Sequence, residues 1–170
     1  MNFFVKLGLF LLAVVMVGFA FGGWLTVGVT MTSSAMLPSI KDGMVVFVNR
    51  TSYQVRDLRR GEIVLVRVPG QELQVVRRIV GLPGETIDMQ AGHVFINGNK
   101  IDEPWLAPLG ADEPKLDAPL SDYFSPVVLG EGSYYVLSDF RKAGNDSRTF
   151  GPIRKDSILG TAWSIFGRVI

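Results

Sequence analysis

The chain of 170 residues contains no cysteine and only one histidine, His93. The lack of cysteine excludes disulfides, thiolate metal ligands and a thiol nucleophile. A single histidine excludes a histidine metal cluster, and a Ser-His-Asp triad would depend on His93 alone. We therefore expect neither a metal nor a cofactor in this protein.

Charge is also scarce in the sequence. Charged residues make up 19% of the chain and the formal net charge is +1, which gives no reason to expect a nucleic-acid partner. The scarcity is greatest at the start, because Lys6 is the only charged residue among the first forty. As a helix, residues 7–29 would be about 35 Å long, enough to cross a bilayer.

This apolar segment has two interpretations, a cleaved signal peptide or an uncleaved anchor. The apolar region of a signal peptide usually has only about 7–15 residues, so the greater length here favours an anchor. Lys6 before the span favours a cytoplasmic N-terminus. We expect residues 1–31 to anchor the chain in the cytoplasmic membrane by a single span at about 7–29, with the C-terminal domain outside the cytoplasm.

After the anchor, short runs rich in Val and Ile alternate with turn residues, a pattern typical of β-strands. The predicted strands are 44–49, 62–68, 73–80, 93–96, 134–137 and 158–166. Asn97-Gly98 is a strong hairpin signal, because both residue types tolerate positive φ. No long stretch after residue 32 has helical periodicity, so we expect a mainly β, antiparallel domain over residues 32–170.

Residues 102–126 interrupt the strand pattern with a cluster of prolines and acidic side chains. This composition predicts an exposed loop between strands. Its acidity suits either a solvated connection or contact with a partner. Near the C-terminus, the apolar residues of 163–170 are expected either to lie against lipid or to form a core strand.

Four sequence blocks resemble, in order, the sequence boxes of type I signal peptidases. The blocks are SSAMLPS (33–39), RGEIV (60–64), VRRIVGLPGE (76–85) and YYVLSDFRKAGNDSRTFG (134–151). The family patterns are S-x-S-M-x-P-T, R-G-D-I-V, V-K-R-V-I-G-L-P-G-D and Y-F-V-L-G-D-N-R-x-x-S-x-D-S-R-x-x-G. The resemblance implies a signal-peptidase-like β domain preceded by one N-terminal transmembrane helix.

The resemblance also implies a mechanism, in which a serine attacks the peptide bond and a neutral lysine accepts the serine proton. The nucleophile position holds Ala35, which has no attacking atom. The general-base position holds Arg77, whose guanidinium stays protonated. The position of a second serine, which orients the lysine, holds Gly144. A laboratory inactivation usually changes one residue, so three joint losses favour a natural pseudoenzyme. Restoring serine at position 35 and lysine at position 77 together is expected to give weak activity at best. Adding serine at position 144 is expected to raise the rate further.

Other positions of the pattern are kept. Ser33 matches the hydroxyl of the family's oxyanion hole, and it is alternatively a turn cap. Met36 and Pro38 are expected at the substrate, near the membrane. Structural roles are implied for Asp139, Arg141, Asp146 and Arg148. The last two match an ion pair of the family.

Three functions stay open from the sequence. The first is a non-cleaving homologue that holds signal peptides, other extended peptides or a membrane protein partner. The second is an active signal peptidase seen in altered form, or one that uses Ser33 or Ser34 as an unusual nucleophile. The third is an accessory subunit of a membrane complex, suggested by the acidic loop and by the Gly18/Gly22 pair in the span. The lipid bilayer is an expected partner in each case.

Overall fold

The computed structural model describes residues 3, 5–14, 26–106, 121–142 and 144–166. Residues 5–14 are helical, and within the described ranges no helix has the length and apolar character needed to cross a membrane. The middle of the predicted span, including Gly18 and Gly22, lies outside these ranges. Residues 26–29, which the sequence placed in the span, belong instead to the first strand, β1 (Thr26–Thr30). The β domain therefore includes residues before the predicted start at residue 32.

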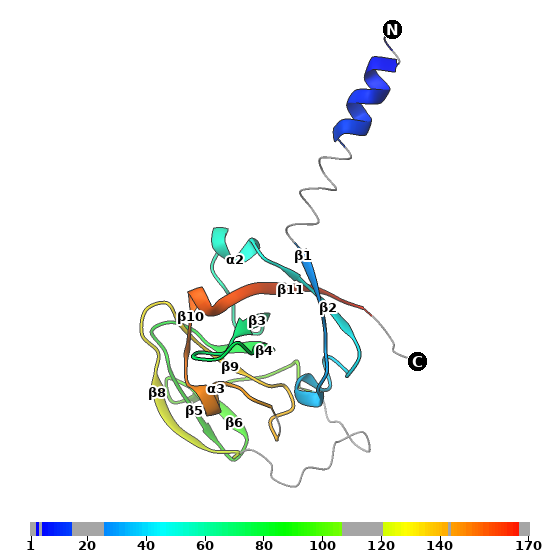
Figure 1. Cartoon of the computed structure of the whole chain (residues 1–170). Helices are drawn as coiled ribbons and strands as arrows, with labels where there is room; N and C mark the ends of the chain where they lie inside the picture. Colours follow the sequence, from blue (N-terminus) through cyan, green and yellow to red (C-terminus); the bar gives the residue numbers. More distant parts are fainter. Residues whose placement is uncertain (1–2, 4, 15–25, 107–120, 143, 167–170) are drawn as a thin grey trace.

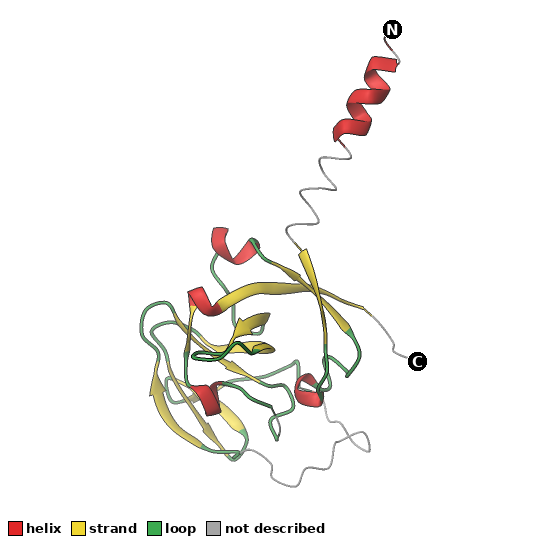
Figure 2. Ribbon diagram, in the orientation of Figure 1, coloured by secondary structure: helices red, strands yellow, loops and turns green. Residues whose placement is uncertain are grey.

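The domain is mainly β and antiparallel, as predicted (Figure 1). A seven-stranded sheet has the order β1-β2-β11-β3-β4-β9-β10. Besides β1, its strands are β2 (Val45–Asn49), β3 (Ile63–Arg67), β4 (Gln74–Gly81), β9 (Ser133–Leu137), β10 (Ile153–Arg154) and β11 (Ile158–Phe166). Figure 2 shows that the remaining helices of the domain are short. They are η1 (Ser34–Met36), α2 (Ser52–Val55), α3 (Ser147–Phe150) and η3 (Lys155–Ser157).

A second, four-stranded sheet has the order β7-β6-β5-β8. Its strands are β5 (Thr86–Gln90), β6 (His93–Ile96), β7 (Asn99–Lys100) and β8 (Phe124–Val128). The Asn97-Gly98 hairpin is confirmed, because both residues have positive φ and they join β6 to β7. β8 begins inside the predicted loop at 102–126 and extends beyond it, and residues 107–120 of the loop are outside the described ranges. Pro126 is tolerated there because β8 is an edge strand.

The core has three apolar clusters, of which the second contains residues of both sheets. β9 separates two of them, since Tyr134 and Val136 enter one cluster while Tyr135 and Leu137 enter the other. This follows from the alternation of side chains along a strand. The third cluster contains Met36 together with residues of β2, β3 and β4. Two of the functional positions adjoin this third cluster, since Ala35 precedes Met36 and Arg77 follows Val76.

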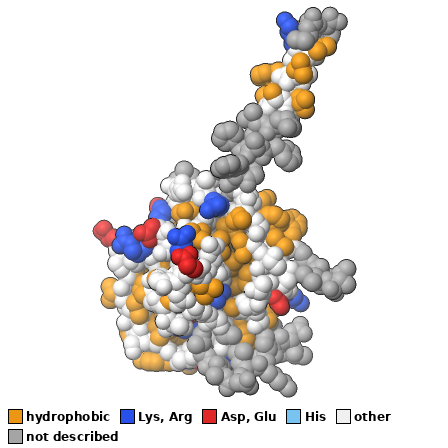
Figure 3. All heavy atoms as spheres, viewed as in Figure 1, with side chains coloured by type: hydrophobic (Ala, Val, Ile, Leu, Met, Phe, Trp, Pro, Cys, Tyr) orange, Lys and Arg blue, Asp and Glu red, His pale blue; other side chains and the backbone are white. Residues whose placement is uncertain are grey.

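Not all apolar side chains are in the clusters. Trp163 and Phe166 of β11 are exposed and make ring contacts with Phe47. Figure 3 shows apolar side chains gathered on the face of the domain formed by β1, β2 and the end of β11. We call Phe47, Trp163 and Phe166 the aromatic patch.

Candidate active site

The turn that carries Ala35 is anchored by buried neighbours. Met36 and Ile40 are fully buried in the third cluster, and Ala35 itself is only 3% exposed. The Ala35 carbonyl accepts a hydrogen bond from the backbone N–H of Phe140 at 3.0 Å. This bond connects η1 to the loop that follows β9. The Ala35 methyl group is therefore held beside the residues of the fourth sequence block.

The neighbours of Ala35 divide between core and surface. Met36, which the sequence placed at the substrate, is fully buried and supports the turn from inside the core. Pro38 is half-buried and follows a cis peptide bond. Ser33 is exposed, and its hydroxyl makes no capping bond to η1. The turn-cap interpretation of Ser33 is therefore wrong.

Arg77 is a buried cation in β4, only 4% exposed. Its Nε donates to the carbonyl of Asn145 at 2.9 Å and its Nη1 to that of Val76 at 2.5 Å. Burial lowers the pKa of Arg77 to about 10, although the negative charges of Asp146 and Asp139 act in the opposite direction. The guanidinium therefore stays charged at neutral pH and has no lone pair for a proton.

Gly144 brings the fourth sequence block against Ala35. Its φ is +106°, and a Cβ built there would lie 3.0 Å from the Cβ of Ala35 and overlap the Oγ of Ser138. The next residue, Asn145, is the one that binds Arg77. The structure therefore brings together the three positions that the resemblance assigns to nucleophile, base and base-orienting residue.

Ser138 is a residue of this site that the sequence reasoning missed. It is fully buried, and its Oγ has no hydrogen-bond partner among the described residues. The family pattern Y-F-V-L-G-D has glycine at this position and serine at position 144, whereas this chain has the reverse. Because one space cannot hold both side chains, the Ser138 hydroxyl occupies the space of a side chain at position 144. Comparing the fourth block with its pattern residue by residue would have revealed the exchange.

Buried ion pairs frame the site. Arg78 binds Asp139 through two hydrogen bonds of 2.7 and 2.5 Å and also donates to the Gly61 carbonyl at 2.6 Å. Arg141 pairs with Glu103 and donates to the Ser138 carbonyl at 2.7 Å. The predicted structural roles of Asp139 and Arg141 thus correspond to fixing the loop after β9.

The predicted pair of Asp146 and Arg148 is present, with an N···O distance of 2.7 Å. Asp146 also accepts the backbone N–H groups of Ser138 and Arg148. Burial alone would raise the pKa of the Asp146 carboxyl, but the hydrogen bond and charge of Arg148, with the two backbone donors, hold it below its ordinary value. Asp146 is therefore an ionised structural group and not a proton acceptor.

A groove with a volume of about 220 Å³ lies beside Ser33 and Arg77. It is lined by residues 29–33, from β1 to Ser33, and by residues 73–77, from the start of β4 to Arg77. β1 is at the end of its sheet, so its outer edge has no strand partner within the described ranges. β9 pairs with β4 only from Arg78 onward, so within the described ranges Gln74 to Arg77 have no strand partner on that edge. The groove therefore lies between two open strand edges.

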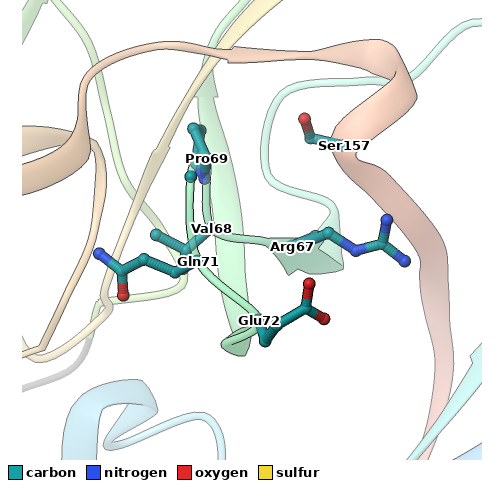
Figure 4. A pocket seen from close by; sticks show the side chains of 7 residues that line it. Arg67, Val68, Pro69, Gln71, Glu72 and Ser157 are labelled. Carbon is teal, nitrogen blue, oxygen red and sulfur yellow. The ribbon is translucent and has the colours of Figure 1, made fainter.

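The remaining candidate features lie apart from the site around Ala35. His93 is exposed on β6 in the smaller sheet, and it is not among the residues that meet at Ala35. Within the described ranges, no group of three His, Asp or Glu side chains is placed to hold a metal ion. Figure 4 shows a second hollow, at the turn between β3 and β4, lined by Arg67, Gln71 and Glu72 among others. It shares no residue with the site around Ala35.

Comparisons with known proteins agree with this arrangement. A family model described as signal peptidase, peptidase S26, matches residues 4–166. The chain is 36% identical over 157 residues to signal peptidase I T of Bacillus subtilis, covering 92% of this chain and 79% of that protein. It is 37% identical over 134 residues to a signal peptidase I of Bacillus amyloliquefaciens, covering 78% of this chain and 69% of the relative.

A solved structure gives the same result for the fold. The crystal structure of a signal peptidase I from Enterococcus faecalis V583 has a TM-score of 0.50 and 28% sequence identity to this chain. The match covers 62% of this chain and 97% of the other. Since the sequence blocks, the β architecture and the relatives agree, the chain belongs to the signal peptidase family, peptidase S26.

Proposed function

We propose that this chain is a non-cleaving member of its family that holds an extended peptide at the outer face of the cytoplasmic membrane. The observation that supports the proposal is that the three replaced positions, 35, 77 and 144, lie together. The methyl group of Ala35 has no electron pair for attack, and Arg77 has none for the proton that a hydroxyl would have to lose. The neighbouring Asp139 and Asp146 are occupied by arginines.

Peptide binding does not depend on the lost groups. An extended peptide adds to an exposed sheet edge through main-chain hydrogen bonds, and specificity comes from the pockets beside it. The groove offers two such edges, one from β1 and one from the first half of β4. Neither edge uses the side chain at position 35 or 144.

The absence of cleavage is tested with the full chain reconstituted in lipid. A preprotein that an active family member processes should stay intact over about pH 6 to 10. The active enzyme in the same lipid is the positive control. Turnover by this chain would contradict the proposal, and its loss in Ser33→Ala or Ser34→Ala would then identify the nucleophile.

Peptide binding is tested with Thr30→Trp, which adds a large ring to a residue that lines the groove. A fluorescent peptide with a signal-peptide-like end should bind the unaltered chain and bind this variant more weakly, as measured by anisotropy. Gln71→Trp adds the same ring at the second hollow and should leave affinity unchanged. Equal affinities for both variants would mean that the peptide does not use the groove.

A further inference from the structure

We propose that Arg77 is a seat for the C-terminal carboxylate of the bound peptide, so that the chain selects peptides that have already been cut. This inference rests on the proposed function, because it specifies which end of a peptide lies in the groove. It assigns to the arginine at the base position a binding role in place of the lost catalytic one.

The first argument is an unpaired charge. Buried charges in proteins are normally paired, because an isolated ion loses its hydration on burial. Arg77 is 4% exposed, and within the described ranges no carboxylate lies at ion-pair distance from it. Its two assigned hydrogen bonds go to backbone carbonyls, which are neutral. Asp146 and Asp139 act on this charge, but each is already paired with another arginine, so Arg77 has no ion-pair partner of its own within the described ranges.

The second argument is the position of Arg77 on the open edge. A peptide laid along β4 finds an unpaired edge from Gln74 to Arg77. From Arg78 onward β9 occupies that edge, beginning with the pair of Arg78 and Leu137. An extended chain that pairs with this edge therefore has to leave it at Arg77. A peptide that ends there fits without a bend, and its last group is a carboxylate.

The third argument is how the guanidinium is held. Nε and Nη1 donate to the carbonyls of Asn145 and Val76, whereas Nη2 makes no hydrogen bond to another described residue. Arg77 also lines the groove, at the end opposite to Leu73 along β4. A guanidinium fixed in this way loses little entropy when it binds a carboxylate.

The experiment compares four fluorescein-labelled peptides on the unaltered full-length chain in lipid nanodiscs at pH 7. The first ends in Ala-Gln-Ala with a free carboxylate, and the second is its C-terminal amide. The third is an amide whose last residue is aspartate, which offers a side-chain carboxylate. The fourth continues for six residues beyond Ala-Gln-Ala. Anisotropy gives the four dissociation constants without relying on the folding of any variant.

We expect the free acid to bind about ten- to a hundredfold more tightly than the amide, the range for a hydrogen bond to a charged group. The extended peptide should bind as weakly as the amide. Arg77→Gln should abolish the difference between acid and amide, and Arg77→Lys should retain part of it. Arg67→Gln, at the second hollow, should leave the difference unchanged.

Other results would contradict the inference in distinguishable ways. Equal binding of acid, amide and extended peptide would overturn the carboxylate seat and leave the peptide-holding function standing. Binding of the aspartate amide as tight as that of the free acid would assign the seat to a side-chain carboxylate. Failure of all four peptides to bind at millimolar concentration would overturn the proposed function itself, and this inference with it.

Discussion

At the scale of single residues, the site departs from the family pattern at two positions and keeps the ion pairs around them. Ala35 and Arg77 differ from the family pattern at the atoms that react, while Arg78, Asp139 and Asp146 keep the ion pairs that position the loop after β9. Buried ion pairs are strongly destabilising when one partner is removed. The stability of the fold therefore depends on these ion pairs, whereas it does not depend on the reactive atoms at positions 35 and 77.

The exchange of Ser138 and Gly144 changes what is needed to restore activity. Ala35→Ser alone should not cleave, because Arg77 cannot accept the serine proton. With Arg77→Lys added, we expect weak turnover at best. From sequence alone, Gly144→Ser was expected to raise it further. In the structure that side chain would overlap Ser138 Oγ, and φ at Gly144 is +106°.

We therefore predict that Gly144→Ser raises the rate only when Ser138→Gly is also introduced. The gain should approach the roughly 10²–10⁴-fold contribution of a well-placed general base. The measurement is preprotein cleavage by the double, triple and quadruple variants in lipid. A triple variant with Ser138 retained that is as fast as the quadruple variant would show that the two side chains do not compete.

At the scale of elements, the pair of Asp146 and Arg148 connects β9 to α3, because Asp146 also accepts the N–H of Ser138. Asp146→Asn should lower the free energy of unfolding by about 3–5 kcal/mol at neutral pH, the usual cost of breaking a buried pair. The pKa of Asp146 is below its ordinary value in the folded chain. The stabilisation is therefore complete above about pH 4, near the carboxyl pKa of the unfolded chain, and is lost as the pH falls through the folded value.

Urea unfolding at pH 7, 5 and 2.5 measures this effect. The difference between the unaltered chain and Asp146→Asn should shrink at the lowest pH, because protonation of Asp146 in the unfolded chain then removes part of the stabilisation. Asp156→Asn is a matched control, because its partner Arg154 and Asp156 itself are largely exposed and such pairs contribute little. A penalty for Asp146→Asn that is constant over this range would mean that the charge of Asp146 is not what stabilises the fold.

At the scale of the whole molecule, the aromatic patch of Phe47, Trp163 and Phe166 lies on the face formed by β1, β2 and β11. β1 directly follows the apolar N-terminal segment in the sequence. We propose that this face rests on the bilayer, since exposed apolar surface near an apolar segment is favourable there. The last residues of the expected lipid-facing segment, 167–170, are outside the described ranges.

Contact with lipid predicts quenching of Trp163 fluorescence in vesicles that contain brominated lipid. The contribution of Trp163 is the difference between the unaltered chain and Trp163→Phe, so the two other tryptophans cancel. Trp105→Phe is the control, because Trp105 packs against Arg78 within the domain. If brominated lipid does not change the Trp163 signal, this face does not contact the bilayer.

Several features of the protein followed from the sequence by itself. Val- and Ile-rich runs between turn residues predicted β2, β3, β4, β6, β9 and β11 to within about two residues, because side-chain period and turn chemistry are local properties. The Asn97-Gly98 hairpin was local in the same way. The order of four blocks was enough to identify the family and to mark Ala35, Arg77 and Gly144 as altered.

Tertiary structure decided the rest. β5 and β8 were missed because their sequences carry weak strand signals and pairing with neighbours determines their conformation. β1 was missed because its Thr and Val residues continue the apolar run that was assigned to the span. The competition of Ser138 with Gly144, and the end of the open edge of β4 at Arg77, arise between residues from different elements. Such contacts depend on how the strands pack, and no local pattern of residues encodes them.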